Sequence, residues 1–398
     1  MNARILRRNR IFSLNSQVNW LKKLFKFAFV MKLSLNAMTK PISFILCAVL
    51  FLCACSETEP SVETIYPLQE TTECGSLDNV FKKVEVYAMS NDVLVSNVAK
   101  AVLVGEDKLV MHDMARQLIL ADLKTGTLTH AARKGRATNE YTSINDIAFD
   151  GKNILVLEDS YIMSLNLSDK TATKHQIPIQ LPFDAMAPVD GGAWLFTAFP
   201  LESNDYDKKK GTLLYKVNYG STESESFIER EDCTFSLFNI SQSSGNKYYL
   251  RPQDSNHIFY RLDEDIPVPE IRVDFGDKNI PARYYFNNAD EDIAKYMRAE
   301  YYKLPMHFMK TDDAMYFRAG GPGADEYDFL YTKPHKGVRW ENKYMDSSAR
   351  IVAASADCYY AVFSKCAVED AEHGALYNLL DASVGEKQSD FYIVKLYI

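Results

Sequence analysis

The stretch from Ala101 to His130, AVLVGEDKLVMHDMARQLILADLKTGTLTH, contains four short apolar segments separated by polar turns. The segments lie at 101–104, 108–113, 117–122 and 127–130. Apolar runs of this length, bounded by turn-forming residues, are typical of β-strands. The stretch therefore predicts an antiparallel sheet of four strands.

The same pattern returns five times further along the chain. The second copy is clear at 147–175, and weaker copies follow at 183–217, 234–274, 305–340 and 350–398. Short strands that repeat with a period of about 40 to 50 residues are typical of a propeller, whose four-stranded blades pack face to face around a channel. The sequence therefore predicts an all-β fold, a six-bladed β-propeller over residues 79–398.

The last copy contains only three strands, whereas a spare strand at Lys82–Ala88 precedes the first copy. We expect this N-terminal strand to become the outer strand of the last blade, because an unpaired strand edge would otherwise remain exposed. Two insertions, at 288–301 and 367–380, favour small helices. The first begins with a capping Asn288 and three acidic residues, followed by apolar positions at helical spacing.

Residues 38–55, MTKPISFILCAVLFLCAC, have the layout of a secretory signal, with a cationic start, an apolar core and small residues at the end. The apolar run is too short to span a bilayer comfortably. Its ending, Leu52-Cys53-Ala54-Cys55, resembles the lipobox of bacterial lipoproteins, in which the last cysteine is acylated. We therefore expect residues 1–55 to be a signal peptide and Cys55 to carry the lipid.

The regions on either side of this signal are both polar. Residues 1–37 are basic and contain no acidic residue, which indicates either an over-extended start, with Met31 or Met38 as the first residue, or a long leader. A retained amphipathic helix on the membrane surface is the alternative. Residues 56–78 are expected to form a polar tether. The protein is then attached to the outer membrane of the cell envelope through its lipid alone, on the periplasmic or the outer face.

The charge of the part after Cys55 excludes one class of partner. Nine of the 45 basic residues but none of the 53 acidic residues precede Cys55, so this part has 36 basic residues and a net charge near −17. A strongly acidic protein repels phosphate backbones, and we expect no nucleic-acid binding. The remaining cysteines, Cys74, Cys233, Cys358 and Cys366, show no zinc-binding spacing. The sequence predicts no metal and no cofactor.

Two segments resemble a known family. They are GRATNEY at 135–141, followed by Ile144-Asn145-Asp146, and HIFYRLD at 257–263. With the strand repeat, they resemble the six-bladed TolB-like or NHL-like β-propeller lipoproteins of Bacteroidota. That family joins its first two blades by a Gly-Arg-Gly-Pro-Gly-Glu-Tyr type segment, in which 137–139 here is Ala-Thr-Asn. The resemblance implies a propeller and a location in the cell envelope, and it implies no particular activity.

No linear catalytic motif occurs in the sequence, and we name no catalytic residue. Arg136, Glu140, Tyr141 and Asp146 precede or begin a predicted innermost strand, so they are the candidates for ligand binding at the channel. Salt bridges and turn hydrogen bonds between blades are the alternative role for these four residues. His112 beside Asp113 could be a base with an orienting carboxylate, but neighbouring strand residues point to opposite faces, which favours a solvated turn.

These observations support two hypotheses from different classes. The first is a monomeric, lipid-anchored binding module that is not an enzyme and holds a peptide, a glycan or an envelope protein at one mouth of the channel. The alternative is a hydrolase or lyase acting on extracellular glycans or lactones. Propeller enzymes can assemble a site from several blades without a linear motif, so the missing motifs do not exclude the second hypothesis.

Overall fold

The structure is a computed structural model. It describes residues 62–198, 211–229, 240–253, 257–281, 300–322, 325–333, 336–342, 348–365, 373–386 and 388–398. The signal segment and Cys55 therefore lie outside the described residues, and so does most of the predicted helix at 288–301.

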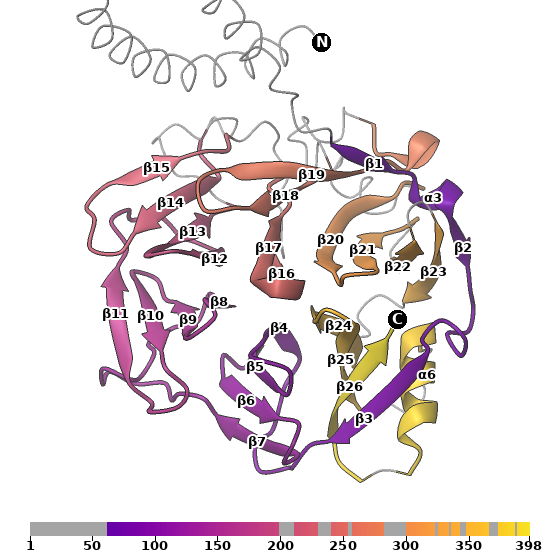
Figure 1. Cartoon of the computed structure of the whole chain (residues 1–398), viewed down its shortest axis with the longest axis horizontal. Coiled ribbons are helices and arrows are strands. Elements are labelled where there is room, and N and C mark those ends of the chain that lie inside the picture. Colours follow the sequence, from indigo (N-terminus) through magenta and orange to yellow (C-terminus); the bar gives the residue numbers. More distant parts are fainter. Residues whose placement is uncertain are drawn as a thin grey trace, which may run out of the picture. The chain divides into compact units, whose positions relative to one another are not determined.

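Six sheets lie side by side around a central channel (Figure 1). Blade 1 contains β4 (Val98–Leu103), β5 (Lys108–Asp113), β6 (Leu118–Asp122) and β7 (Thr127–His130); blade 2 contains β8 (Asp146–Phe149), β9 (Ile154–Leu157), β10 (Tyr161–Leu165) and β11 (Ala172–Gln176); blade 3 contains β12 (Ala185–Val189), β13 (Gly192–Phe196), β14 (Leu214–Asn218) and β15 (Ser224–Ser226). Within each of these blades, neighbouring strands are antiparallel and consecutive in sequence.

The remaining blades each recruit a strand from the N-terminal part of the chain. Blade 4 contains β16 (Ile240–Ser243), β17 (Lys247–Leu250), β18 (Ile258–Leu262), β19 (Pro267–Val273) and β1 (Glu63–Ile65); blade 5 contains β20 (Lys303–Lys310), β21 (Met315–Gly320), β22 (Glu326–Lys333), β23 (Lys336–Asn342) and β2 (Thr71–Glu73); blade 6 contains β24 (Ala349–Ala354), β25 (Cys358–Ser364), β26 (Phe391–Tyr397) and β3 (Lys83–Ala88). The prediction of a six-bladed propeller is confirmed.

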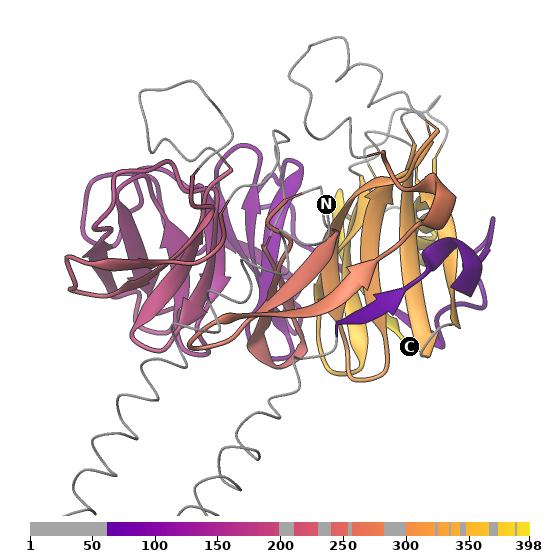
Figure 2. The ribbon, with the colours of Figure 1, turned by 90° about the horizontal axis from the view of Figure 1, so that it is seen from above.

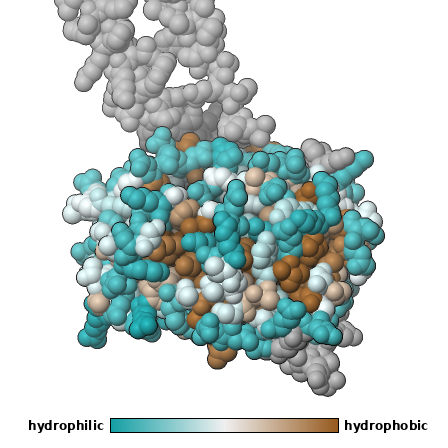
Figure 3. Space-filling model, turned by 60° about the horizontal axis from the view of Figure 1, so that its bottom comes forward, coloured by the Kyte–Doolittle hydropathy of each residue, from teal (hydrophilic) through white to brown (hydrophobic). Residues whose placement is uncertain are grey.

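The blades are held together by the apolar faces between them. Blades 2, 3 and 4 share a cluster around Trp194 and Phe196, and blades 5 and 6 share one around Trp340 and Tyr359. A single sheet cannot bury both of its faces, so each blade depends on its two neighbours. Figure 2 shows the same blades from the side. On the face shown in Figure 3, hydrophilic residues predominate and hydrophobic ones form separate patches.

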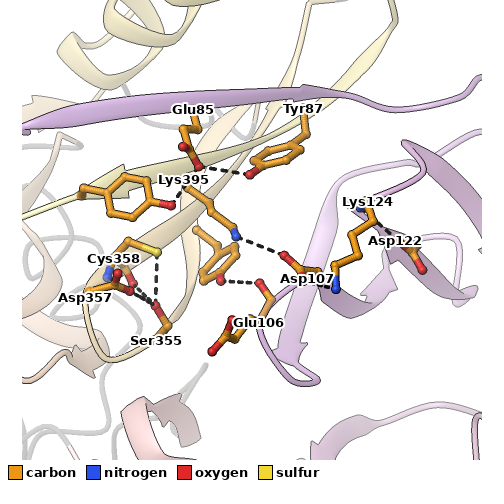
Figure 4. Close-up of polar contacts among 12 residues, drawn as sticks. Glu85, Tyr87, Glu106, Asp107, Asp122, Lys124, Ser355, Asp357, Cys358 and Lys395 are labelled. Atoms are coloured by element: carbon orange, nitrogen blue, oxygen red, sulfur yellow. Dashed lines mark hydrogen bonds and ion pairs between the residues drawn. The ribbon is translucent and has the colours of Figure 1, made fainter.

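The predicted closure of the ring is confirmed. Strand β3 pairs antiparallel with β26, with Val86 opposite Val394, and so completes blade 6. Blade 6 is then fastened to blade 1 (Figure 4): the Lys395 ammonium lies 3.5 Å from the Asp107 carboxylate, and the Tyr360 hydroxyl donates a 2.9 Å hydrogen bond to the Glu106 carbonyl. The two ends of the propeller thus meet in one sheet, and two polar contacts join that sheet to blade 1.

Part of the stretch expected to be a tether forms regular structure. Strands β1 and β2 pair parallel with β19 and β23, and the short helix α3 (Pro67–Glu70) joins them. The Ile65 side chain is fully buried, and the Arg339 guanidinium donates to the Thr71 carbonyl and to Glu73. The segment therefore runs along the outer edges of blades 4 and 5.

Blade 4 differs most from its prediction. The copy of the strand pattern predicted there begins at residue 234, whereas β16 begins at Ile240 and contains Ser241, Gln242 and Ser243. This strand lies in the middle of the ring in Figure 1. The Gln242 side chain accepts a 2.8 Å hydrogen bond from the Leu103 N–H of β4 in blade 1, so it connects two blades that are not neighbours.

The insertion predicted at 367–380 overlaps a helix, α6 (Ala375–Val384), which extends further and packs on blades 5 and 6 through Leu376 and Leu380. It ends at Gly385, whose positive φ of 65° suits a residue without a side chain. Within the described residues, no helix is both long and apolar enough to cross a bilayer.

Candidate binding site in the channel

The channel contains a cavity of about 260 Å³. Each of the six innermost strands contributes to its wall; one residue from each, in blade order, is Lys100, Asp146, Ala185, Gln242, His307 and Arg350. Most of the wall comes from the first half of these strands, so the cavity lies at the end of the channel where the innermost strands begin. A site assembled from six blades leaves no linear motif, which agrees with the sequence.

Irregular backbone shapes this wall. The innermost strands of blades 1, 5 and 6 each have a register shift, at Val98/Lys100, between Lys303 and Met309, and at Ile351/Ala353. His307 lies within such a shift and has a φ of 54°, which is uncommon for a residue other than glycine. Bulges of this kind redirect side chains and are common beside functional sites.

An ion pair joins three blades at the cavity wall. The Lys100 ammonium of blade 1 lies 2.7 Å from the Asp146 carboxylate of blade 2. The same carboxylate accepts a 2.7 Å hydrogen bond from the Met186 N–H at the free edge of blade 3. Burial raises the pKa of Asp146, while Lys100 acts in the opposite direction. The charge of Lys100 is thus largely compensated.

Arg350 of blade 6 is different, because its charge has no such partner. Its Nε atom is buried, and the described part of the chain supplies no hydrogen-bond or ion-pair partner for this side chain. Burial, with a further contribution from the Arg318 charge, lowers the pKa of Arg350 to about 10. The guanidinium therefore stays protonated at neutral pH and faces the cavity as an uncompensated cation.

Two histidines of the wall are neutral at the same pH. His112 lies opposite Lys100 in the β4–β5 ladder, and its buried Nε2 atom has no partner in the described part of the chain. Burial lowers the pKa of His112 to about 4. The pKa of His307 is also well below its usual range, first through burial and then through the charges of Arg318 and Arg350.

A buried network lies behind the cavity wall in blade 5. The Asp328 carboxylate, fully buried, accepts hydrogen bonds from Arg318 Nε at 2.7 Å and from the Tyr316 hydroxyl at 2.8 Å. Glu326 lies 3.3 Å from the other side of the same guanidinium. The charge of Arg318 is therefore compensated within its own blade, which leaves Arg350 as the uncompensated cation of this region of the described structure.

A carboxylate marks the mouth of the cavity. Asp184 is exposed there and accepts a 2.7 Å hydrogen bond from the Ala198 N–H. Partial burial raises the pKa of Asp184, and the nearby Asp146 charge raises it further. The site thus offers a cationic donor inside, neutral imidazoles on the wall and an acid at the entrance. Among the described residues, no three His, Cys, Asp or Glu side chains lie close enough together to hold a metal ion.

Of the four candidates from the sequence, the structure places one at this cavity. Asp146 lines it, whereas the other three lie in the connection between β7 and β8. Arg136 is exposed, Glu140 accepts a hydrogen bond from the Ala137 N–H, and Tyr141 is buried with its hydroxyl donating to the Arg116 carbonyl. A role of these three in ligand binding stays a prediction.

The expectation for His112 was wrong. It is not part of a solvated turn, because β5 extends through Asp113 and His112 is buried against the channel. The turn beyond it is built by Asp113, whose carboxylate accepts hydrogen bonds from the Gln117 and Ser96 N–H groups. Lys100, His307 and Arg350 were not predicted as site residues. The sequence feature that could have identified them is a charged or imidazole side chain within an innermost strand, because a residue that only packs there would be expected to be apolar.

Comparison with known proteins supports the fold. The crystal structure of a Bacteroides fragilis protein, whose export is inferred, superposes on this chain with a TM-score of 0.62. The two sequences are 14% identical, and the superposition covers 85% of this chain and 99% of that one. YCF48 from Cyanidioschyzon merolae is more distant, with a TM-score of 0.39 at 10% identity, covering 79% and 98%. No curated protein matches the sequence. A model described as "DUF5128: 6-bladed beta-propeller" matches residues 55–350, so the chain belongs to the DUF5128 family.

Proposed function

We propose that the protein is a binding module of the cell envelope that holds a small ligand in the channel cavity. The main support for this proposal is that all six innermost strands contribute to one cavity. This cavity contains a charged side chain, Arg350, without a partner in the described structure. Ligand sites are typically concave and mainly apolar, with a few convergent polar groups. The cavity fits this description, with Ile240, Met309 and Ile351 beside its polar groups.

The rim at this end also favours contact with another molecule. Some connections between blades at this end are long; for example, β19 ends at Val273 and β20 begins at Lys303, whereas β20 and β21 at the opposite end are separated only by residues 311–314. Two of the most exposed apolar side chains, Leu94 and Met114, lie on blade 1 beside the start of β4. A larger partner could therefore rest on the rim while one of its groups enters the cavity.

A hydrolase or lyase remains a second candidate because of one specific observation. Asp146, Asp184, His112 and His307 come from four blades and border the same cavity, and the pKa of each is shifted. Perturbed titratable groups in a cleft are typical of active sites. However, Lys100 and the Met186 N–H already occupy the Asp146 carboxylate, so the binding role is favoured.

The binding proposal is tested by blocking the cavity. Ala99 lines it, and Ala99→Trp should fill the space and abolish ligand-induced thermal stabilisation in a screen of sugars, peptides and organic acids. Thr173→Trp, on the exposed outer strand β11, is the matched control and should behave as the wild type. Unchanged ligand binding by Ala99→Trp would reject the cavity as the binding site. Turnover of a bound compound, lost on Asp184→Asn, would favour the enzyme.

The envelope location is part of the proposal and rests on the sequence ending at Cys55. The fold likeness to a protein described by inference as exported supports an extracytoplasmic location. In cells, Cys55→Ser should move the protein from the membrane fraction to the soluble fraction. Cys74→Ser, which changes a half-buried free cysteine, should leave the protein in the membrane fraction. Membrane attachment of both variants would contradict the lipid anchor.

A further inference from the structure

Arg350 is costly for the ligand-free protein. A guanidinium removed from water loses hydration free energy, and proteins normally recover it through an ion pair or hydrogen bonds. Arg318 in the neighbouring blade follows this rule, since Asp328 and Glu326 surround it. Arg350 does not follow it within the described structure, although it lies close enough to Arg318 for that charge to lower its pKa.

The groups that share the cavity leave one positive charge uncompensated. Lys100 is paired with Asp146, and both wall histidines are neutral at pH 7. Asp184 lies at the mouth, where solvent reaches it, and it is bonded to the Ala198 N–H. The charge balance therefore matches a monoanion in contact with Arg350. A dianion such as phosphate would add a second negative charge beside Asp146 and Asp184.

We propose, on the basis of the binding function above, that the cavity binds the carboxylate of a small organic acid, with the Arg350 guanidinium as the principal donor. The planar guanidinium matches a carboxylate in a two-bond arrangement. The buried His112 Nε2 offers a further polar contact, which suits a hydroxyl group beside the carboxylate. The volume of about 260 Å³ lies just below the usual range for drug-sized ligands, so the acid is about the size of a sugar acid or an amino acid.

The test compares matched ligands with the wild-type protein. A panel of monocarboxylates, including lactate, glucuronate and N-acetylated amino acids, is measured by thermal shift and calorimetry beside glucose and glucose 6-phosphate. We expect at least one carboxylate to bind, glucose not to bind, and the phosphate to bind more weakly than glucuronate. Binding of neutral compounds alone would overturn the carboxylate assignment while the proposed binding function stands. Absence of any binding would count against both.

Variants of Arg350 separate ligand recognition from a structural role. Arg350→Gln should weaken carboxylate binding at least about tenfold, the effect of losing a charge-assisted hydrogen bond. The unfolding midpoint of the ligand-free variant should be unchanged or higher, because a half-buried charge without an ion-pair partner is removed. Arg350→Lys keeps the charge but not the planar fork and should bind with intermediate affinity. Arg272→Gln, which changes an exposed arginine of β19 far from the innermost strand, is the matched control.

Two results would contradict the role of Arg350. One is unchanged carboxylate affinity in both Arg350 variants, which would place the carboxylate elsewhere in the cavity. The other is a strongly lowered unfolding midpoint of ligand-free Arg350→Gln with unchanged affinity, which would make the arginine a structural residue.

Discussion

Single buried residues make the stability of the fold depend on pH. His112 and His257 are both buried, and burial lowers the pKa of His112 to about 4 and that of His257 to about 3. In the unfolded chain a histidine has a pKa near 6.5. Between pH 6.5 and the folded value, the unfolded state therefore binds more protons, and acid favours unfolding.

We expect the free energy of unfolding to fall as the pH decreases from 6.5 toward 4, by about 2 kcal/mol for His112 at pH 5. His112→Gln should remove this part of the dependence, because glutamine does not titrate. Urea unfolding at pH 7.5 and pH 5.0 measures the difference. His130→Gln, which changes an exposed histidine of the same blade, should keep the wild-type dependence. Equal pH dependence in both variants would show that His112 is protonated in the folded protein.

At the scale of the element, the strands of blades 1 and 2 could be predicted closely, because their apolar runs are interrupted by short polar turns. The prediction for β5, 108–113, agrees with the structure exactly at both ends. The closing strand β3 was predicted from the count of strands. The inner strand of blade 4 could not be predicted, since Ser241-Gln242-Ser243 carries no apolar signal and is stabilised by partners far away in sequence.

Strands β1 and β2 were missed for a related reason. Each is only three residues long and pairs parallel at an outer edge. Such a short strand shows no clear alternation of apolar and polar residues from which it could be predicted. The candidate site was predicted only in part. Asp146 could be named because it begins a strand after a polar connection, whereas the meeting of Lys100, His307 and Arg350 depends on how six blades are arranged in space.

The element with the most unusual partner is β16. Strand β4 is innermost in its blade, so its Leu103 N–H faces away from the rest of the sheet, and Gln242 accepts its hydrogen bond. Gln242→Ala should cost about 1 kcal/mol or more, because it leaves a partly buried N–H group without its partner. Urea unfolding measures this loss. Gln117→Ala removes local bonds near the surface of blade 1 and should cost less. A larger loss for Gln117→Ala would contradict the bridging role of Gln242.

At the scale of the whole molecule, we expect the ring to be stable only when its first and last blades are joined. Blade 6 takes its outer strand β3 from the N-terminal part of the chain and contacts blade 1 through Lys395 and Asp107 (Figure 4). Strands β1 and β2 also come from that part but add to blades that already have four strands. Their loss should therefore weaken the ring, whereas the loss of β3 should open it.

Three truncated forms of the protein, beginning at residues 62, 75 and 89, compare the loss of β1 and β2 with the loss of β3. The protein beginning at 75 lacks β1 and β2 and should unfold cooperatively, with a loss of about 2 kcal/mol or more, the contribution expected from burying Ile65. The protein beginning at 89 also lacks β3, which exposes the edge of β26 and the apolar cluster against which Val84 and Val86 of β3 pack. We expect it to aggregate or to unfold without a cooperative transition, as followed by circular dichroism and size-exclusion chromatography. Cooperative unfolding of this shortest protein would show that five complete blades and one blade of three strands suffice for a stable ring.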